Sequence, residues 1–234
     1  MTKRLTGRLA LVTGASRGLG AAVARRYAAE GAQLILLARN VKGLEQLDDD
    51  IRKLGASATL VPLDLRQFDR IDQMAASLHQ RFGKLDVLAA CAGMLGHLAP
   101  TGHFDPALWQ EVLDTNFTSN WRLIRALDPL LRASSAGRAI FATCATARSF
   151  SPYWSAYGAS KAALEAMVKI YASEMTQSTV RANLVDPGPM QTELRFAAFP
   201  FEDRTTLKTP DTATEPFVAL AEAACMRNGE LITP

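Results

Sequence analysis

The stretch that decides the fold runs Thr13-Gly14-Ala15-Ser16-Arg17-Gly18-Leu19-Gly20, between a short apolar segment and a long amphipathic one. Glycines at these points permit a tight turn, a close approach of the backbone to a phosphate, and close packing of a helix on a strand. The free N–H groups at the start of the following helix would also attract a phosphate. A loop of this kind can equally serve only to connect a strand to a helix, so the motif alone leaves both interpretations open.

Outward from this loop, short apolar runs alternate with longer amphipathic stretches along almost the whole chain. That alternation predicts an α/β fold of the Rossmann type, a doubly wound parallel sheet of about seven strands with helices on both faces. The expected strands are residues 9–13, 33–38, 59–62, 85–89, 138–143, 180–185 and 231–232. The expected helices are residues 18–30, 41–54, 70–82, 106–131 and 154–176.

The composition favours a single domain. The chain has 234 residues, of which 48% are hydrophobic and 21% charged, and no Pro/Gly/Ser-rich or highly charged linker divides them. We therefore expect one Rossmann-type domain over residues 1–234. After Asp186 the alternation gives way to a segment with several prolines and phenylalanines. Its residues from about 190 to 210 are expected to form a substrate lid.

Charge and cysteine usage exclude several classes of protein. The 26 basic and 23 acidic residues are scattered, which argues against a nucleic-acid partner. The chain shows no signal-peptide pattern and no apolar run near the roughly 20 residues of a membrane span, so we expect a cytoplasmic protein without a membrane partner. Three cysteines at long spacings fit neither a disulfide framework nor a zinc site, and the three histidines have no partners at metal-ligand spacing, so no metal is expected.

The end of the second expected strand indicates which dinucleotide would bind. Ala38 stands where a site for NAD usually carries a carboxylate that accepts hydrogen bonds from the ribose. Arg39 follows, and Arg39 together with Arg17 could pair with a 2′-phosphate, which predicts NADP(H). Either arginine could instead be a solvated surface side chain. Asp64, at the end of the third strand, could accept a hydrogen bond from the adenine amino group or cap a helix.

A possible catalytic pair lies near the start of the last long helix. Tyr157 and Lys161 are four residues apart, which places them on one face of a helix. A phenol has an ordinary pKa of about 10, and a neighbouring ammonium would bring that pKa closer to neutrality. Tyr157 could then donate a proton to a carbonyl oxygen or remove one from an alcohol. A tyrosine and a lysine at this spacing also occur often by chance.

Taken together, these parts resemble the short-chain dehydrogenase/reductase family over nearly the whole chain. The resemblance rests on the order and spacing of the glycine loop, Asp64, Asn116, the Tyr157 to Lys161 motif, Asn183, Pro187-Gly188 and Thr192. Residues 94–109, 199–200 and 207–210 also look like a bacterial subgroup of unassigned substrate. The family usually forms dimers or tetramers, so the resemblance implies a homodimer or homotetramer.

The resemblance implies a set of site residues and an activity, namely hydride transfer between NADP(H) and a small carbonyl or alcohol substrate. Asn116 would hold a helix kink and a water, and Lys161 would also bind the nicotinamide ribose. The implied catalytic residues are Asn116, Cys144, Tyr157 and Lys161. The implied cofactor-binding residues are Gly14, Ser16, Arg17, Gly18, Leu19, Gly20, Arg39, Asp64, Leu65, Ala92, Gly93, Tyr157, Lys161, Pro187, Gly188 and Thr192.

Two positions depart from the family pattern. Cys144 stands thirteen residues before Tyr157, where the family usually has a serine that hydrogen-bonds the substrate oxygen. A thiol is a weaker donor than a hydroxyl. Thr143 or Thr146 could therefore substitute, the thiol could suffice, or the site could be impaired. Likewise, Ala90-Cys91-Ala92-Gly93 stands where the family has Asn-Asn-Ala-Gly.

These departures keep a second class of function open. An oxidoreductase is favoured by Asn116, Tyr157 and Lys161. A dinucleotide-binding protein with weak or no turnover, acting as a sensor or partner-binding subunit, is favoured by Cys91 and Cys144. A flavin or nucleotide-sugar enzyme on a similar sheet would need a larger substrate region than the residues after Asp186 provide.

Overall fold

A computed structural model describes residues 3–233, and Met1, Thr2 and Pro234 of the expected domain lie outside the described residues. Seven parallel strands form one sheet in the order β3-β2-β1-β4-β5-β6-β7, which confirms the Rossmann-type fold. Because the order reverses between β1 and β4, a crevice is expected at their carboxyl ends. The strands are β1 (Leu9–Thr13), β2 (Gln33–Ala38), β3 (Ala58–Pro62), β4 (Val87–Ala90), β5 (Arg138–Ala142), β6 (Arg181–Val185) and β7 (Leu231–Ile232).

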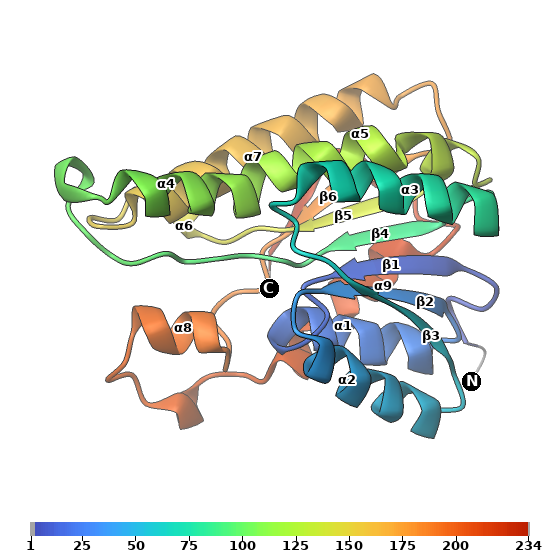
Figure 1. Cartoon of the computed structure of the whole chain (residues 1–234), viewed down its shortest axis with the longest axis horizontal. Coiled ribbons are helices and arrows are strands. Elements are labelled where there is room, and N and C mark those ends of the chain that lie inside the picture. The colour runs from blue at the N-terminus through green and yellow to red at the C-terminus, as the bar shows by residue number, and fades with distance from the viewer. Residues whose placement is uncertain (1–2, 234) are drawn as a thin grey trace.

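Helices cover both faces of this sheet (Figure 1). One face packs against α1 (Gly18–Ala29), α2 (Val41–Lys53) and α9 (Glu215–Ala221). The other face packs against α3 (Phe68–Phe82), α5 (Ser119–Arg132) and α7 (Ser155–Glu174), with α4 (Pro106–Leu113) leading into α5. None of the helices in residues 3–233 is both long and apolar enough to span a membrane.

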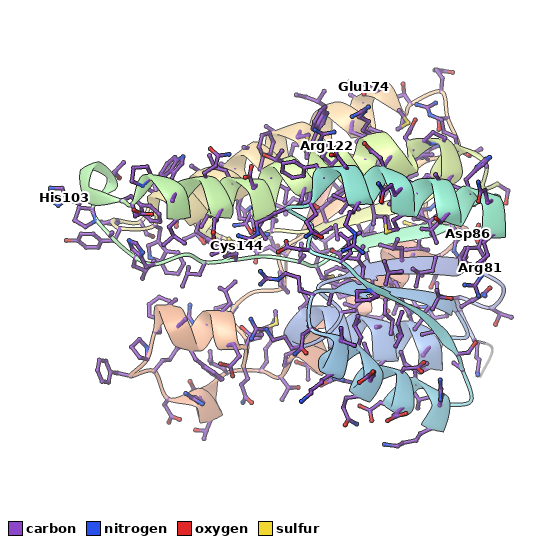
Figure 2. All side chains as sticks on the ribbon, viewed as in Figure 1. Arg81, Asp86, His103, Arg122, Cys144 and Glu174 are labelled. Carbon is purple, nitrogen blue, oxygen red and sulfur yellow. The ribbon has the colours of Figure 1, made fainter. Side chains whose placement is uncertain are left out.

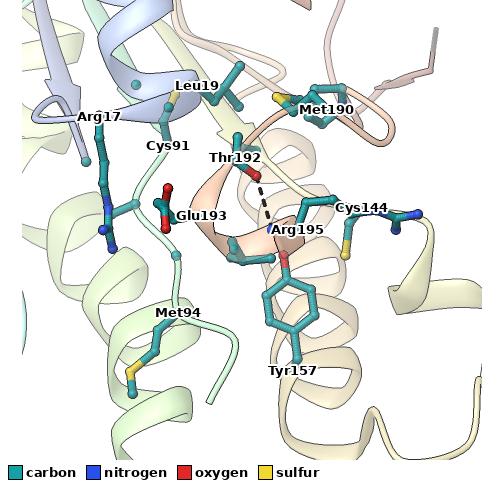
Figure 3. Close-up of a pocket in the computed structure, with 18 of the residues that line it drawn as sticks. Arg17, Leu19, Cys91, Met94, Cys144, Tyr157, Met190, Thr192, Glu193 and Arg195 are labelled. Atoms are coloured by element: carbon teal, nitrogen blue, oxygen red, sulfur yellow. Dashed lines mark hydrogen bonds between the residues drawn. The ribbon is translucent and has the colours of Figure 1, made fainter. Parts of the chain in front are cut away.

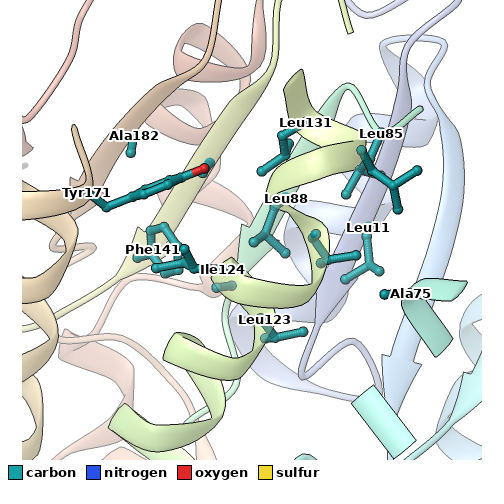
Figure 4. Close-up of a cluster of buried hydrophobic side chains, with 14 of the residues drawn as sticks. Leu11, Ala75, Leu85, Leu88, Leu123, Ile124, Leu131, Phe141, Tyr171 and Ala182 are labelled. Atoms are coloured by element: carbon teal, nitrogen blue, oxygen red, sulfur yellow. The ribbon is translucent and has the colours of Figure 1, made fainter. Parts of the chain in front are cut away.

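The packing of the core explains why the strands appear in the sequence as continuous apolar runs. Every residue of β1, β4 and β5 is buried, because helices exclude water from both faces of the sheet. Figure 4 shows part of the cluster between the sheet and α5, which includes Leu88, Phe141 and Ile124. Burying one such side chain contributes about 1.5–3 kcal/mol to stability. The packed sheet therefore gives a rigid base to the loops at its edges.

The expected elements are present, with boundaries shifted by one or two residues. The expected helix over residues 106–131 is interrupted by a π-helical turn at Asp114–Thr118. Three short helices were missed, namely α6 (Thr146–Ser149), α8 (Glu193–Ala198) and α9. Helix α9 shows why, because Phe217, Val218 and Leu220 are all buried within seven residues. A helix of seven residues with adjacent buried positions is too short to show the amphipathic pattern by which helices are recognised.

The segment expected to form a lid is folded. Met190 pairs with Lys208 in an isolated parallel bridge, which closes the segment at its base. The side-chain amide of Gln191 donates to the carbonyl oxygens of Arg204 and Leu207, both at 2.9 Å. Helix α8 lies between these contacts and projects away from the sheet (Figure 1).

A buried polar cluster lies at the amino ends of the strands, here called the amino edge of the sheet. Asp86 is 3% exposed and accepts hydrogen bonds from the Leu9 N–H at 2.9 Å, the Ser134 hydroxyl at 2.5 Å and the Lys84 ammonium at 3.0 Å. The Arg8 guanidinium donates to the carbonyl oxygen of Asp86 at 3.0 Å. Figure 2 shows Asp86 at the opposite end of the strands from Cys144.

Candidate active site

A cavity of about 1090 Å³ lies at the carboxyl ends of the strands (Figure 3). All of the cofactor-binding residues expected from the sequence line it, although they come from segments spread over residues 14–192. Of the four expected catalytic residues, Cys144, Tyr157 and Lys161 also line the cavity. Asn116 is the exception, because its side chain is fully buried behind the wall. The fold therefore brings the predicted residues together in one place.

The glycine loop has the geometry expected for a phosphate site. Gly14 has a φ of +66°, and a Cβ there would lie 2.8 Å from the Cα of Ala92. A Cβ on Gly20 would lie 2.3 Å from the carbonyl oxygen of Gly14. Both positions therefore exclude a side chain. Within residues 3–233, no side chain caps the first N–H groups of α1, so these donors and the positive end of the helix dipole remain available to an anion.

The expected adenosine end of the cavity is charged and open to solvent. The Arg39 side chain is 63% exposed, and its Nη1 lies 3.6 Å from Oδ2 of Asp64. Asp64 accepts hydrogen bonds from the N–H and Nη2 of Arg66, both at 3.0 Å. Burial opposes ionisation of Asp64, but the contacts with Arg66 outweigh it and lower the pKa of the carboxyl. The alternative role of Asp64 as a helix cap is wrong, because the N-cap residue of α3 is Gln67.

Tyr157 and Lys161 lie on one face of α7, as their spacing predicts. Both side chains are buried, and the Lys161 Nζ lies 5.9 Å from the centre of the Tyr157 ring. The ammonium donates a hydrogen bond to the carbonyl oxygen of Ala142, the last residue of β5, at 2.9 Å. This bond ties α7 to the carboxyl end of the sheet and holds Lys161 beside the cavity.

The expected effect of Lys161 on the phenol is wrong in this structure. The pKa of Tyr157 is raised well above its ordinary value by burial, and then by the nearby Cys144 thiol and the Asp186 carboxylate. Burial also lowers the pKa of Lys161. Desolvation disfavours the charged form of both groups and is the largest cause of each shift. Tyr157 is therefore a neutral phenol at neutral pH, which suits it to donate a proton.

Asn116 sits in the π-helical turn, where the resemblance implies a helix kink. Its Nδ2 donates to the carbonyl oxygen of Met94 at 2.8 Å and to the Ser160 hydroxyl at 3.0 Å, while its Oδ1 accepts from the Met94 N–H at 2.8 Å. π-Bulges of this kind are frequent at functional sites. Asn116 thus joins the segment after β4 to α7, and its role in holding a water stays a prediction.

Cys144 faces the cavity beside Tyr157, and its neighbouring threonines differ. The Cys144 sulfur lies 2.9 Å from the Thr146 hydroxyl, and either atom can be the donor. The Thr143 hydroxyl instead donates to Oε1 of Glu165 at 2.7 Å and is buried. Of the two threonines that could replace the usual serine, Thr146 therefore has the better position.

The structure shows which residues of the expected lid and of the segment before Tyr157 line the cavity. Met190, Leu194, Ala198 and Phe199 come from the lid segment and have no motif of their own. Trp154, which comes three residues before Tyr157, also lines the cavity, whereas Tyr153 is 58% exposed. The one available signal was that these apolar side chains follow Pro187-Gly188 or precede Tyr157 closely.

Comparisons with known proteins agree with this geometry. A family model of the short chain dehydrogenases matches residues 8–203. The chain belongs to the short-chain dehydrogenase family. Within that family, the oxidoreductase YciK of Escherichia coli is 38% identical over 209 residues, which make up 88% of this chain and 82% of that protein. A benzil reductase of Saccharomyces cerevisiae that forms (S)-benzoin is 34% identical over 199 residues, which make up 81% of this chain and 74% of that protein.

Solved structures of the family share the whole fold. A short chain dehydrogenase from Shigella flexneri, complexed with NADP, matches with a TM-score of 0.96 at 34% identity, over 100% of this chain and 99% of that chain. For residues 3–233, the structure shows no cluster of His, Cys, Asp or Glu side chains that could hold a metal ion.

Proposed function

We propose that this short-chain dehydrogenase transfers a hydride between NADP(H) and a carbonyl or alcohol substrate, with Tyr157 as general acid and base. The observation that carries the proposal is the single cavity in which an uncapped helix N-terminus, a buried tyrosine and a buried lysine converge. Titratable residues that converge in a cavity of this size are a common place of catalysis.

NADP(H) fits the residues of the cavity. Gly14 and Gly20 let the loop pack tightly where any side chain would collide with backbone, and the N-terminus of α1 supplies donors for a pyrophosphate. Arg17 and Arg39 line the same cavity on the side of Asp64 and supply cations for a 2′-phosphate. The NADP complex of the Shigella flexneri relative supports the same cofactor. Pro187, Gly188 and Thr192 would lie along the nicotinamide half.

The chain's own residues supply the proton and the orientation. The bound cofactor supplies the hydride. Tyr157, neutral in its buried position, donates its proton to the carbonyl oxygen in reduction and takes it back in oxidation. Lys161 would stabilise the phenolate that remains and would hydrogen-bond the ribose of the bound cofactor. Cys144 and Thr146 face the same oxygen and orient it, with a weaker hydrogen bond from the thiol than from a hydroxyl.

Three further features belong to the proposal. Residues 190–210 form a lid over a single NADP(H)-binding domain, because α8 and its flanking turns line the cavity without joining the sheet. A homodimer or homotetramer stays an expectation, with Trp121 of α5 and Ile170 of α7, 45% and 60% exposed, as the apolar side chains available to a second copy. The cytoplasmic location expected from the sequence stays a prediction.

Titration with both reduced cofactors, followed by a panel of carbonyl compounds, tests the proposal. We expect NADPH to bind more tightly than NADH and at least one carbonyl to be reduced at neutral pH. Equal or tighter binding of NADH would refute the assignment of the 2′-phosphate site. Tight NADPH binding without turnover of any carbonyl would favour a sensor or partner-binding protein, the alternative that Cys91 and Cys144 suggest.

A further inference from the structure

One side of the cavity beside Tyr157 is apolar, whereas Cys144, Thr146 and Lys161 supply polar groups on the other side. Leu95, Tyr157 and Ala198 form a small buried cluster. Leu98, Cys144, Trp154 and Leu194 pack against it. These side chains come from the segment after β4, the region around α6 and α7, and α8, so three separate parts of the chain close over the reacting group. A substrate whose carbonyl reaches Tyr157 therefore places its neighbouring atoms among hydrocarbon side chains.

Aromatic rings lead from the phenol to the rim of the cavity. The Trp154 ring lies 5.9 Å from that of Tyr157, and the Phe199 ring lies 5.7 Å from that of Trp154 with an angle of 35° between the planes. Phe199 is 37% exposed, so this row of rings ends at solvent. Centroid distances of 4.5–7 Å are those at which aromatic rings attract one another. An aromatic ring of a substrate can therefore pack along the same row.

The charged side chains near this wall already have partners. The Arg195 guanidinium lies 3.9 Å above the Phe199 ring, and its Nε donates to Oε2 of Glu202 at 2.7 Å. Lys161 donates to the carbonyl oxygen of Ala142. Glu193 follows Thr192, whose methyl group lies near Gly18 of the glycine loop, so Glu193 belongs to the cofactor side. Burying a charged group without a partner is costly, so this wall disfavours a charged substrate.

We propose that the substrate is an uncharged carbonyl compound that carries an aromatic ring, which packs against Trp154 and Phe199. This inference rests on the proposed function, since it assumes that Tyr157 protonates the carbonyl oxygen. Trp154 and Phe199 then determine specificity, and the paired Arg195 leaves a carboxylate on the substrate without a partner.

Three ketones test the substrate class, namely acetophenone, its para-carboxylate and butanone, each reduced with NADPH. We expect kcat/KM for acetophenone to exceed that of the other two by about tenfold or more. Trp154→Ala should lower kcat/KM for acetophenone by about tenfold, mainly through KM, and leave butanone within about twofold. Phe199→Ala should act in the same direction. Phe201→Ala is the matched control, because Phe201 lies two residues away and is 100% exposed.

Preference for butanone or for the carboxylate would overturn the inference while leaving the proposed function intact. Failure to reduce any ketone would count against the proposed function instead. In that case calorimetry with the NADP⁺ complex still decides the substrate class. Acetophenone must bind more tightly than its para-carboxylate, and Trp154→Ala must weaken that binding. Equal binding of the two ketones would contradict the inference.

A second, independent observation concerns an ion network beside the site, in which the partly exposed Arg148 side chain meets two buried carboxylates. Arg148 of α6 pairs with the carboxylate of Glu165 on α7, and its Nη2 lies 2.7 Å from Oδ2 of Asp186, the residue after β6. Glu165 also accepts the hydrogen bond from Thr143. Asp186 also accepts a hydrogen bond from the Gly188 N–H at 3.0 Å. Both carboxylates are buried.

The network joins the segments that carry the reacting groups. Cys144 directly follows Thr143, Gly188 lies two residues after Asp186, and Lys161 lies one turn before Glu165 on α7. We infer that Arg148 is a positioning residue. It fixes the positions of the end of β5, the end of β6 and α7 relative to one another around the cavity. This role also rests on the proposed function, although none of the three charged groups touches the substrate oxygen.

The same network bears on the ionisation of the catalytic pair. Tyr157 faces the Cys144 thiol and the Asp186 carboxylate, and Asp186 raises the pKa of the phenol. Lys161 faces Cys144, Cys91 and Glu165, and these groups oppose the lowering of the Lys161 pKa by burial. The positive charge of Arg148 lies between the two carboxylates. Its removal exposes both catalytic groups to uncompensated negative charge, which raises both pKa values.

Arg148→Met and Arg148→Lys test this role, with NADPH affinity and the pH profile of kcat as readouts. We expect Arg148→Met to lower kcat by about tenfold or more, to weaken NADPH binding, and to move the limb of the profile that reports Tyr157 to higher pH. Arg148→Lys should restore most of the profile. Arg4→Met is the matched control, because Arg4 also bridges two carboxylates, Glu215 and Glu222, outside the cavity.

An unchanged pH profile together with NADPH binding within about twofold of the parent would show that Arg148 has no positioning role. If the parent itself reduces no ketone, the proposed function is at fault. NADPH titration of Arg148→Met and Arg148→Lys then decides the inference, because the Asp186 to Gly188 contact lies in the cofactor segment.

Discussion

Polar groups have different roles at the two ends of the strands, which we call the amino edge and the carboxyl edge of the sheet. At the amino edge, the Asp86 carboxylate is satisfied by Leu9, Ser134 and Lys84, and these contacts join strands and loops. At the carboxyl edge, the glycine loop and the first N–H groups of α1 face a cavity instead. Satisfied buried groups stabilise a fold, whereas groups that face a cavity are available to a ligand. The comparison indicates that substitutions at one end of the strands can change the free energy of unfolding without changing cofactor binding or turnover, and the reverse.

Loss of the Tyr157 hydroxyl should have the largest effect, and only on chemistry. Tyr157→Phe removes the proposed proton donor, so we expect turnover to fall by about 10²–10⁴-fold. NADPH affinity and the thermal midpoint should stay near those of the parent. Steady-state kinetics, cofactor titration and calorimetry measure the three quantities. Tyr153→Phe, on an exposed neighbour, is the control, and residual turnover of Tyr157→Phe within about tenfold of the parent would place the donor elsewhere.

Loss of the Asp86 carboxylate should have the opposite pattern. Asp86→Ala leaves the buried Leu9 N–H and Ser134 hydroxyl without an acceptor, so we expect the free energy of unfolding to fall by roughly 3 kcal/mol. Denaturant titration measures this loss. NADPH affinity of the folded protein should not change, and a matching loss of affinity would break the separation between the two edges.

Acid should weaken the amino edge through the same residue. Burial raises the pKa of Asp86, but hydrogen bonds from Leu9, Ser134 and Lys84 outweigh it and lower the pKa below its ordinary value. The folded-state pKa is therefore below the unfolded value of about 3.9, so the stabilisation is present above that value and is lost as the pH falls through the folded pKa. Denaturant titrations of the parent from neutral pH to about pH 2 should show this loss, and Asp86→Asn should lack that component.

At the carboxyl edge, Arg39 should separate the two cofactors. Arg39→Asp replaces a cation beside the proposed 2′-phosphate with an anion, so NADPH binding should weaken by about 1.5–3 kcal/mol. NADH binding should change much less, because NADH lacks that phosphate. Titration with both cofactors measures the difference. Arg81→Asp makes the same charge change near the amino edge and serves as the control (Figure 2). Equal losses of affinity for NADPH and NADH would show that Arg39 does not bind the 2′-phosphate.

Cys144 should give the smallest effect and the only gain. A well-placed donor to an oxyanion is worth about 2.7–4 kcal/mol, and a thiol supplies only part of this. Cys144→Ser should therefore raise kcat for a reducible ketone, by about tenfold, without changing NADPH affinity. Cys225→Ser, outside the cavity, is the control. If Cys144→Ser has no effect and Thr146→Val abolishes turnover, Thr146 is the donor.

The sequence by itself was sufficient where the physical cause is local. The strands were recognisable because residues buried on both faces of a parallel sheet form apolar runs. The glycine loop was recognisable because Gly14 and Gly20 meet backbone that leaves no room for a side chain. The shared face of Tyr157 and Lys161 follows from the helical repeat alone.

Only the tertiary structure decided the properties that depend on distant segments. The pKa of Tyr157 rises because Leu95 from the segment after β4 and Ala198 from α8 help to bury the phenol, which no spacing reveals. Arg148 meets Glu165 and Asp186 across three elements, and each of these residues alone resembles an ordinary surface charge. Trp154 and Phe199 become neighbours only when α8 closes over α7. The burial of a side chain and its contacts depend on segments that are far apart in the sequence. Tertiary structure therefore decided the chemistry of the site, whereas local sequence motifs were enough to locate it.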